Sequence, residues 1–205
     1  GRVSKPDKPD SSTRNRLIAA TLEIIDDRGA EEVKIGEVVE RAGTTTGSLY
    51  WFFKNRQHLI DSALAERYLT HMRAVVDRIA EVADTTTEPI SLLSNIVFDL
   101  SEPARVIARH RQIRVLADAL DDPDLGREIA RIQKEFLAVT TSLIEKGQDA
   151  GKVRKDFDAY SLALFSQSVT IGLAVADLSP ELMPDPKKWW ELTRNFLSGL
   201  GPRPE

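Results

Sequence analysis

Residues 43–60 read GTTTGSLYWFFKNRQHLI, a stretch rich in hydroxyl groups, aromatic rings and cations. No acidic residue occurs between Arg41 and Ile60, although the chain of 205 residues holds 32 acidic and 28 basic residues. Gly43, the first residue of this stretch, follows an apolar helical pattern over about residues 35–42. Helix, glycine turn and second helix form the outline of a helix-turn-helix, whose second helix enters the major groove of DNA. The missing carboxylates fit a surface that approaches phosphates without repulsion.

The residue types at the start of the second helix fit contact with a duplex. Thr45, Thr46 and Ser48 carry short hydroxyl groups, which hydrogen-bond to phosphates and base edges. Gly47 allows the helix backbone to approach the duplex closely, and in an ordinary helix it would cost about 1 kcal/mol relative to Ala. The same pattern also describes a capped turn between two helices of any protein, so both interpretations stay open on spacing alone.

Aromatic and basic residues extend this surface toward the next helix. Tyr50 and Trp51 carry polar tips suited to phosphate contact, although aromatic residues at helical spacing also occur in protein cores. Lys54 and Arg56 stand where the next helix begins, close to the expected path of the DNA backbone. These residues favour DNA binding without excluding the core interpretation.

Helical spacing of apolar residues continues through the remainder of the chain, and alternating strand patterns do not occur. We therefore predict an all-α protein of about nine helices. Ser11, Ser12 or Thr13 can cap the first helix, which should end at Gly29. The expected parts of the chain are a flexible N-terminal arm (1–10), a three-helix helix-turn-helix DNA-binding domain (11–58) and a helical effector-binding and dimerisation domain (59–205).

Prolines and polar junctions predict the later helix boundaries. Helices should open at Thr87-Glu88-Pro89, at Ser101-Glu102-Pro103 and at Asp122-Pro123, where a cap or an acid precedes a proline in the first turn. The last two helices should cover about residues 158–178 and 187–200, on either side of a proline-rich loop.

Composition narrows the class of protein. Apolar residues make up 41% of the chain and charged residues 29%, which is typical of a soluble globular protein. Because the chain contains no Cys, disulfides, thiolate zinc sites and a cysteine nucleophile are excluded, and a cytoplasmic location is expected. The net charge is −4 while residues 1–60 carry +1, so the total charge says little about a nucleic-acid partner.

Two other classes of function stay open, namely a helical enzyme and a helical adaptor that uses the motif for protein contact. The histidines His58, His71 and His110 are scattered, and the sequence shows no nucleophile–base–acid grouping, phosphate-binding glycine loop or metal-ligand spacing. We therefore expect no catalytic residues, no metal and no cofactor. Both alternatives predict that salt-dependent DNA binding is absent.

The stretch 159–176 contains no charged residue, which indicates a helix buried on more than one side. A membrane span is the competing interpretation, but hydroxyl and amide side chains argue against it, so no membrane association is expected. We expect the last two helices of two chains to form a four-helix homodimer interface; alternatively, both helices close the core of one chain. The expected interface residues are Leu164, Ile171, Gly172, Val175, Trp189, Leu192 and Phe196.

The segment AGTTTGSLYWFFKNRQHL (42–59) resembles the DNA-reading segment of the TetR family of bacterial transcriptional regulators. Upstream, RLIAATLEIIDDRGAEEVKIGEVVERAG (16–43) is similar to the first two helices of that family. The match covers roughly residues 13–62. The resemblance implies a repressor that binds a palindromic double-stranded DNA operator as a homodimer and is released by a small-molecule effector.

Two positions depart from the family's pattern. Lys34 stands where Thr usually caps the second helix, and Val39 stands where Ala is preferred. Lys34 cannot cap the helix but can contact a phosphate as a point charge. Carried over by position, the resemblance implies DNA contacts from Arg14, Lys34, Thr45, Thr46, Gly47, Ser48, Tyr50, Trp51, Lys54 and Arg56.

The middle helices should enclose a pocket for an effector of unknown identity, as the resemblance implies. Polar groups beside apolar stripes and nearby aromatic rings are what such a pocket needs, although each also fits a surface or core position. The basic run from Arg105 to Arg114 could attract an anion, but most of it is expected to be a solvated face paired with Asp118, Asp121 or Asp122. The expected effector contacts are Asn95, Phe98, His110, Arg114, Gln133, Phe136, Gln167 and Thr170.

Overall fold

The computed structural model describes residues 10–83 and 103–202. These residues form eight α-helices and three short 3-10 helices, with no strand among them, so the predicted all-α class is confirmed. The chain divides into two compact units between Tyr68 and Leu69. The expected boundary lay earlier, at residue 58. The division falls later because the first turns of the fourth helix, including Leu59 and Ile60, pack into the core of the first unit.

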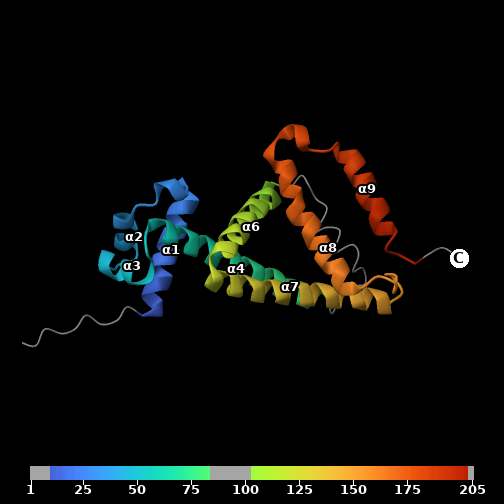
Figure 1. Ribbon diagram of the computed structural model, residues 1–205, viewed down its shortest axis with the longest axis horizontal. Helices are drawn as coiled ribbons and strands as arrows, with labels where there is room; N and C mark the ends of the chain where they lie inside the picture. The colour runs from blue at the N-terminus through green and yellow to red at the C-terminus, as the bar shows by residue number, and fades with distance from the viewer. Residues whose placement is uncertain (1–9, 84–102, 203–205) are drawn as a thin grey trace, which may run out of the picture. The chain divides into compact units, whose positions relative to one another are not determined.

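The first unit contains three complete helices and the start of a fourth (Figure 1). Their bounds are α1 (Ser11–Arg28), the 3-10 helix η1 (Ala30–Glu32), α2 (Ile35–Arg41), α3 (Thr46–Phe52) and α4 (Arg56–Ala83). The cap of α1 differs from the expectation of Ser11, Ser12 or Thr13. Asp10 caps the helix, and its Oδ1 accepts from the backbone N–H of Thr13 at 2.9 Å. Gly43 joins α2 to α3 with a φ of 61°, a backbone conformation that residues with a side chain rarely adopt.

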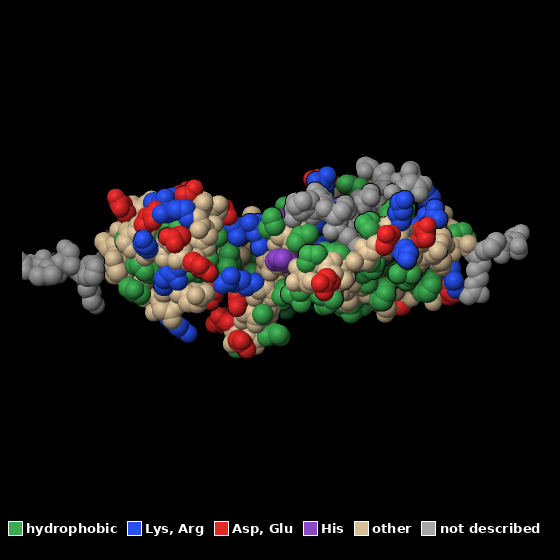
Figure 2. Space-filling view, turned by 90° about the horizontal axis from the view of Figure 1, so that it is seen from above, with side chains coloured by type: hydrophobic (Ala, Val, Ile, Leu, Met, Phe, Trp, Pro, Cys, Tyr) green, Lys and Arg blue, Asp and Glu red, His purple; other side chains and the backbone are tan. Residues whose placement is uncertain are grey.

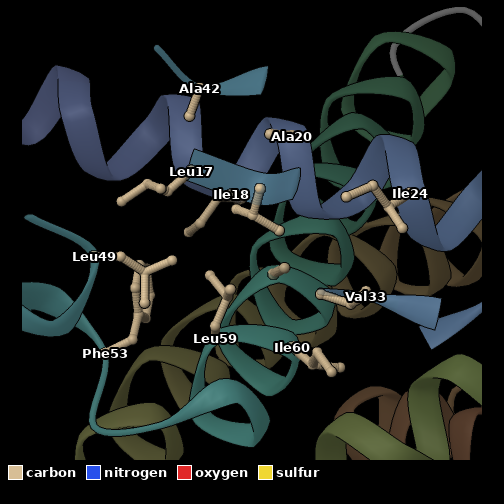
Figure 3. Close-up of a cluster of buried hydrophobic side chains, with 12 residues drawn as sticks. Leu17, Ile18, Ala20, Ile24, Val33, Ala42, Leu49, Phe53, Leu59 and Ile60 are labelled. Atoms are coloured by element: carbon tan, nitrogen blue, oxygen red, sulfur yellow. The ribbon is translucent and has the colours of Figure 1, made fainter. Parts of the chain in front are cut away.

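Apolar side chains from all of these helices meet in one cluster (Figure 3). Leu17 and Ile24 enter it from α1, Leu49 from α3 and Leu59 from α4, and each is fully buried. Phe53, directly after α3, lies in the same cluster. This core fixes α3 against α1 and α4, so the opposite face of α3 is left for contact with a partner.

The second unit contains the end of α4 and the remaining helices. Their bounds are α6 (Pro103–Asp121), α7 (Pro123–Asp149), α8 (Ala159–Gly172), the 3-10 helices η2 (Leu173–Leu178) and η3 (Pro180–Leu182), and α9 (Pro186–Ser198). The helix expected at 158–178 is α-helical only as far as Gly172 and continues as η2. The helix expected to open at Thr87-Glu88-Pro89 lies outside the described residues.

The last three α-helices each begin with an aspartate cap. Asp122 caps α7, Asp158 caps α8 and Asp185 caps α9, each through hydrogen bonds to backbone N–H groups of the first turn. The core of this unit includes Leu143 and Ile144 of α7 and residues from α4, α8 and the segment after α9. In Figure 1, α9 (red) turns back after η2 and η3 and runs antiparallel to α8 (orange).

Candidate DNA interface and dimer face

Helix α3 has one buried face and one exposed face. Leu49 is fully buried in the core, whereas Tyr50 is 51% and Trp51 55% exposed. Thr46 and Gly47, in the first turn, are also exposed. Two large aromatic side chains held in solvent on a seven-residue helix are not explained by the packing of this unit. They form, with Thr46 and Gly47, the surface that we call the α3 face.

The hydroxyl groups at the start of α3 have different tasks. Thr45 caps the helix, because its Oγ1 accepts from the backbone N–H of Ser48 at 3.1 Å. The same Thr45 hydroxyl donates to Oγ of Ser48 at 3.1 Å. The Ser48 hydroxyl therefore keeps its own hydrogen for a partner outside this cap, while the Thr45 hydroxyl is largely used within it.

Arg56, an expected phosphate contact, has a different set of partners. Its Nε donates to the carbonyl of Val33 at 2.6 Å, and one Nη donates to the carbonyls of Ala30 and Glu31 at 2.8 Å each. Arg56 therefore joins the start of α4 to the segment between α1 and α2. Lys54 differs, because its side chain is exposed beside α3.

The other two expected cations lie on α1 and at the start of α2. The Arg14 guanidinium of α1 lies 5.8 Å from the centre of the Phe53 ring and is half-buried. Lys34 occupies the N-cap position of α2, is exposed, and makes no capping hydrogen bond from its side chain. Lys34 thus leaves α2 without a side-chain cap, as its chemistry predicts.

An ion network holds α2 against α1. One carboxylate oxygen of Glu37 in α2 accepts from Arg28 at the end of α1 and from Arg41 at 2.8 Å. The hydrogen bond from Arg28, and then that from Arg41, holds the pKa of the Glu37 carboxyl below its usual value. The network orients α2, which packs against α3, and so supports the position of the α3 face.

A second exposed surface is apolar and lies on α8 and α9. Leu164, Phe165, Leu192 and Phe196 are exposed, and the rings of Phe165 and Phe196 lie 5.6 Å apart, so the two helices share this surface. Figure 2 shows hydrophobic side chains gathered in neighbouring patches on this unit. We call these four residues the α8–α9 face. The exposed Tyr160 and Val175 continue it along the chain, and Ile171 and Trp189 are half-buried.

Known proteins share both the segment and the fold. Residues 17–63 match the family model for bacterial regulatory proteins of the tetR family. The transcriptional repressor KstR2 of Mycolicibacterium smegmatis is 24% identical over 170 residues, which cover 80% of each chain. Together the comparisons indicate a TetR-family transcriptional regulator. The chain is accordingly a helix-turn-helix transcriptional regulator, as the sequence resemblance predicted.

Solved structures show that the TetR-like fold extends over nearly the whole chain. A transcriptional regulator from Saccharomonospora viridis in complex with choline has a TM-score of 0.64 and 20% identity, covering 92% of this chain and 97% of its own. FadR from Bacillus subtilis in complex with stearoyl-CoA has a TM-score of 0.54 and 16% identity, covering 91% and 96%. These TM-scores establish a shared fold.

The expected effector residues of this TetR-family chain are only partly brought together. Gln133 of α7 and Gln167 of α8 are half-buried and hydrogen-bonded through their amides. Phe136, on the same helix as Gln133, packs against the core of the second unit. The Thr170 hydroxyl donates to the carbonyl of Ser166 at 3.2 Å. His110 and Arg114 on α6 are exposed. Asn95 and Phe98 lie outside the described residues.

One member of the basic run on α6 is placed differently from the expectation. Arg109 is 4% exposed and does not lie on a solvated face. Its Nε and one Nη donate to the two carboxylate oxygens of Asp177 in η2, at 2.9 and 2.7 Å, and the Asp177 side chain is fully buried. Nε2 of His110 lies 3.4 Å from the same carboxylate. The hydrogen bonds from Arg109 hold the pKa of Asp177 below its usual value.

Within the described residues, Ala159–Leu178 is the one stretch long and apolar enough to cross a membrane by length and composition. Its α-helical part, α8, has 14 residues. At 1.5 Å per residue such a helix is about 21 Å long, short of the roughly 30 Å of a bilayer core. The stretch also ends with the charged side chain of Asp177 paired to Arg109. These features fit a helix of a folded protein domain.

Proposed function

We propose that this chain is a transcriptional repressor that binds a palindromic DNA operator as a homodimer and leaves it when a small molecule binds. The observation that carries the proposal is the α3 face, where Tyr50 and Trp51 are held in solvent on a helix without acidic residues. The surrounding core fixes the helix from the other side, so the face is presented ready for the groove of a duplex.

The proposed DNA contacts differ in their tasks. Thr46, Gly47, Ser48, Tyr50 and Trp51 form or adjoin the exposed surface of α3 and would approach bases and phosphates. Lys54, Lys34 and Arg14 would contribute positive charge toward the phosphates on either side. Arg56 leaves this set, because its guanidinium donates to three backbone carbonyls of its own chain. Repression is supported by the likeness to the repressor KstR2.

The homodimer would form through the α8–α9 face. One α3 helix reads only a few base pairs, so specificity requires a second copy about one helical turn away on the DNA. The exposed side chains of Leu164, Phe165, Leu192 and Phe196 supply the apolar surface, and the contact between the rings of Phe165 and Phe196 joins its two helices. Packing this face against its copy would bury it from water, with a favourable free energy that grows with the area covered.

The small-molecule effector would bind within the second unit. Structures with the same fold hold choline in one case and stearoyl-CoA in another, so the fold accommodates ligands of very different size and polarity. The amides of Gln133 on α7 and Gln167 on α8, which are hydrogen-bonded to each other, would supply polar contacts for such a ligand. A ligand that fits one dimer geometry better than another would change operator affinity by that difference.

Salt-dependent DNA binding tests the proposal. The equilibrium constant for a labelled DNA duplex, followed by fluorescence anisotropy, should fall steeply as salt rises, because phosphate contacts release counterions. Tyr50→Ala should weaken binding at every salt concentration with the helical fold intact by circular dichroism. Lys134→Ala on α7, an exposed lysine outside the proposed surface, is the control and should bind as the wild type does. Binding that is absent, or unchanged in Tyr50→Ala, would favour an adaptor or an enzyme instead.

A further inference from the structure

We infer that the buried ion pair between Arg109 and Asp177 is a positioning device for the homodimer, because it holds the end of η2 from which the chain turns into α9. The inference rests on the proposed dimer through the α8–α9 face. Arg109 and Asp177 lie outside the α8–α9 face but would set the geometry of that face.

The pair is a directional link between α6 and the segment after α8. Two parallel hydrogen bonds, 2.9 and 2.7 Å long, join the planar guanidinium of Arg109 to both oxygens of Asp177. Such a bidentate contact fixes orientation as well as distance. Because both side chains are buried, water does not compete for these hydrogen bonds.

Helix α9 is held to the unit mainly toward its C-terminal end, where Leu197 packs against the core and Phe196 meets Phe165 of α8. After its C-terminal end, Leu200 is buried in the core and its carbonyl accepts from the backbone N–H of Arg154 at 2.8 Å. At its N-terminal end, α9 follows the short η3 turn, and the paired Asp177 lies just before that turn. In the first half of the helix, Trp190 and Leu192 are more than half exposed, whereas Trp189 is half-buried and Thr193, at the middle of the helix, is buried. The first half is therefore packed less closely within the chain than the second.

The position of this first half therefore depends on where η2 ends. Leu192 belongs to the α8–α9 face, and its distance from Leu164 and Phe165 on α8 decides whether two copies of the face fit together. If η2 were released from α6, the turn at residues 179–185 could swing while Leu200 stayed anchored. The dimer would then lose the fixed spacing of its helices without loss of the core.

Replacing both residues of the ion pair should affect stability differently from replacing only one of them. A buried ion pair often adds little to stability compared with well-packed apolar residues, whereas removing one partner leaves an uncompensated buried charge. Replacing both residues, as in Arg109→Met/Asp177→Leu, should therefore keep the fold while removing the directional contact. Replacing only the acid, as in Asp177→Asn, removes the ion pair with almost no change of shape.

Sedimentation equilibrium and hydrogen exchange of the full-length chain test the inference. We expect the wild type to be a dimer at micromolar concentration, and Asp177→Asn to raise the dimer dissociation constant at least tenfold. Backbone amides in the first half of α9 should exchange faster in the variant, while those around Leu143 and Ile144 in the core should not. Asp149→Asn, which removes the exposed ion pair with Lys155, is the matched control and should change neither measurement.

The outcomes separate this inference from the proposed function. If the wild type is a monomer, the proposed dimer is wrong and the inference falls with it. If the wild type is a dimer and Asp177→Asn dimerises with the same constant as Asp149→Asn, the inference is overturned and the proposed function stands. If Asp177→Asn does not fold, the double variant decides: a folded chain with a weakened dimer supports the inference, and a wild-type dimer constant overturns it.

Discussion

The backbone N–H of Lys54 donates a hydrogen bond of 3.0 Å to Nδ1 of His58, one helical turn later. In return, the backbone N–H of His58 donates to Oδ1 of Asn55 at 2.8 Å. The arrangement is similar to a capping box, with histidine in the place usually held by Glu or Gln, except that His58 accepts from the residue before the N-cap Asn55. The edge of the imidazole also meets the ring of the buried Phe53, with 5.9 Å between ring centres. The cap therefore holds Lys54, a proposed phosphate contact, against the core of the first unit.

His58→Ala should lower the free energy of unfolding by about 1 kcal/mol, because the Lys54 N–H loses its acceptor at the start of α4. His58→Gln should recover most of this loss, since Gln supplies an acceptor in the same box. Urea denaturation of the two variants and the wild type measures the difference. Equal stability of His58→Ala and the wild type would show that the cap contributes nothing.

The two exposed glycines of α2 and α3 should respond alike in stability and differently in DNA binding. A Cβ at Gly36 would meet no atom within 4 Å, and one at Gly47 only the Thr45 hydroxyl at 3.8 Å. Both Gly→Ala variants should gain about 0.5–1 kcal/mol in stability. Gly47→Ala should bind DNA more weakly because its methyl group lies on the α3 face, whereas Gly36→Ala should bind normally. Loss of binding in both, or in neither, would argue against a close approach at Gly47.

Lys54 and Arg56 should separate DNA binding from stability. Arg56→Lys should lower the free energy of unfolding by about 1–3 kcal/mol, since a single ammonium group cannot serve the three carbonyls that the guanidinium reaches. Lys54→Ala should leave stability within about 0.5 kcal/mol of the wild type. It should reduce the slope of log affinity against log salt by about 1. If Lys54→Ala lowered the free energy of unfolding and Arg56→Lys changed only DNA binding, the roles assigned to both residues would be wrong.

Acid should weaken the contact between α1 and α2. The pKa of Glu37 is held below its usual value of 4.5 chiefly by Arg28, so the folded state favours the ionised carboxylate. The resulting stabilisation is complete above that usual value and is lost as the pH falls through the lowered pKa. Glu37→Gln should therefore be less stable than the wild type at pH 7, with a smaller difference at pH 3. Thermal unfolding of both proteins at both pH values measures the difference in stability. The same difference at pH 7 and pH 3 would show that ionisation of Glu37 does not stabilise the fold.

Local signals explain why the α3 segment was predicted so closely from sequence. The helix expected after Gly43, with Thr45 and Thr46 at its start, is α3, and Thr45 caps it. Capping hydroxyls, the glycine turn and the apolar positions that define it all lie within a few residues of each other. The aspartate caps of α7, α8 and α9 are similarly local, and the corresponding helix starts lie within a few residues of those expected.

Contacts between distant parts of the chain were the ones missed. The basic side chain of Arg56 beside the motif suggested a phosphate contact, but its carbonyl partners lie 23 to 26 residues earlier. Arg109 and Asp177 are 68 residues apart, and the nearer acids on α6 offered simpler partners. Tyr160 and Phe165 were not singled out, although the charge-free run that contains them was the available signal. Helical periodicity identifies an apolar face without identifying what covers it.

Selection from random double-stranded DNA, followed by sequencing of the bound fraction, tests whether this chain reads DNA as a homodimer. We expect an enriched inverted repeat with half-sites about one helical turn apart or slightly more, because two α3 faces are held at one spacing by the dimer. The enrichment should disappear for Tyr50→Ala. No enriched sequence, or a single site without two-fold symmetry, would contradict the claim that this chain reads DNA as a homodimer.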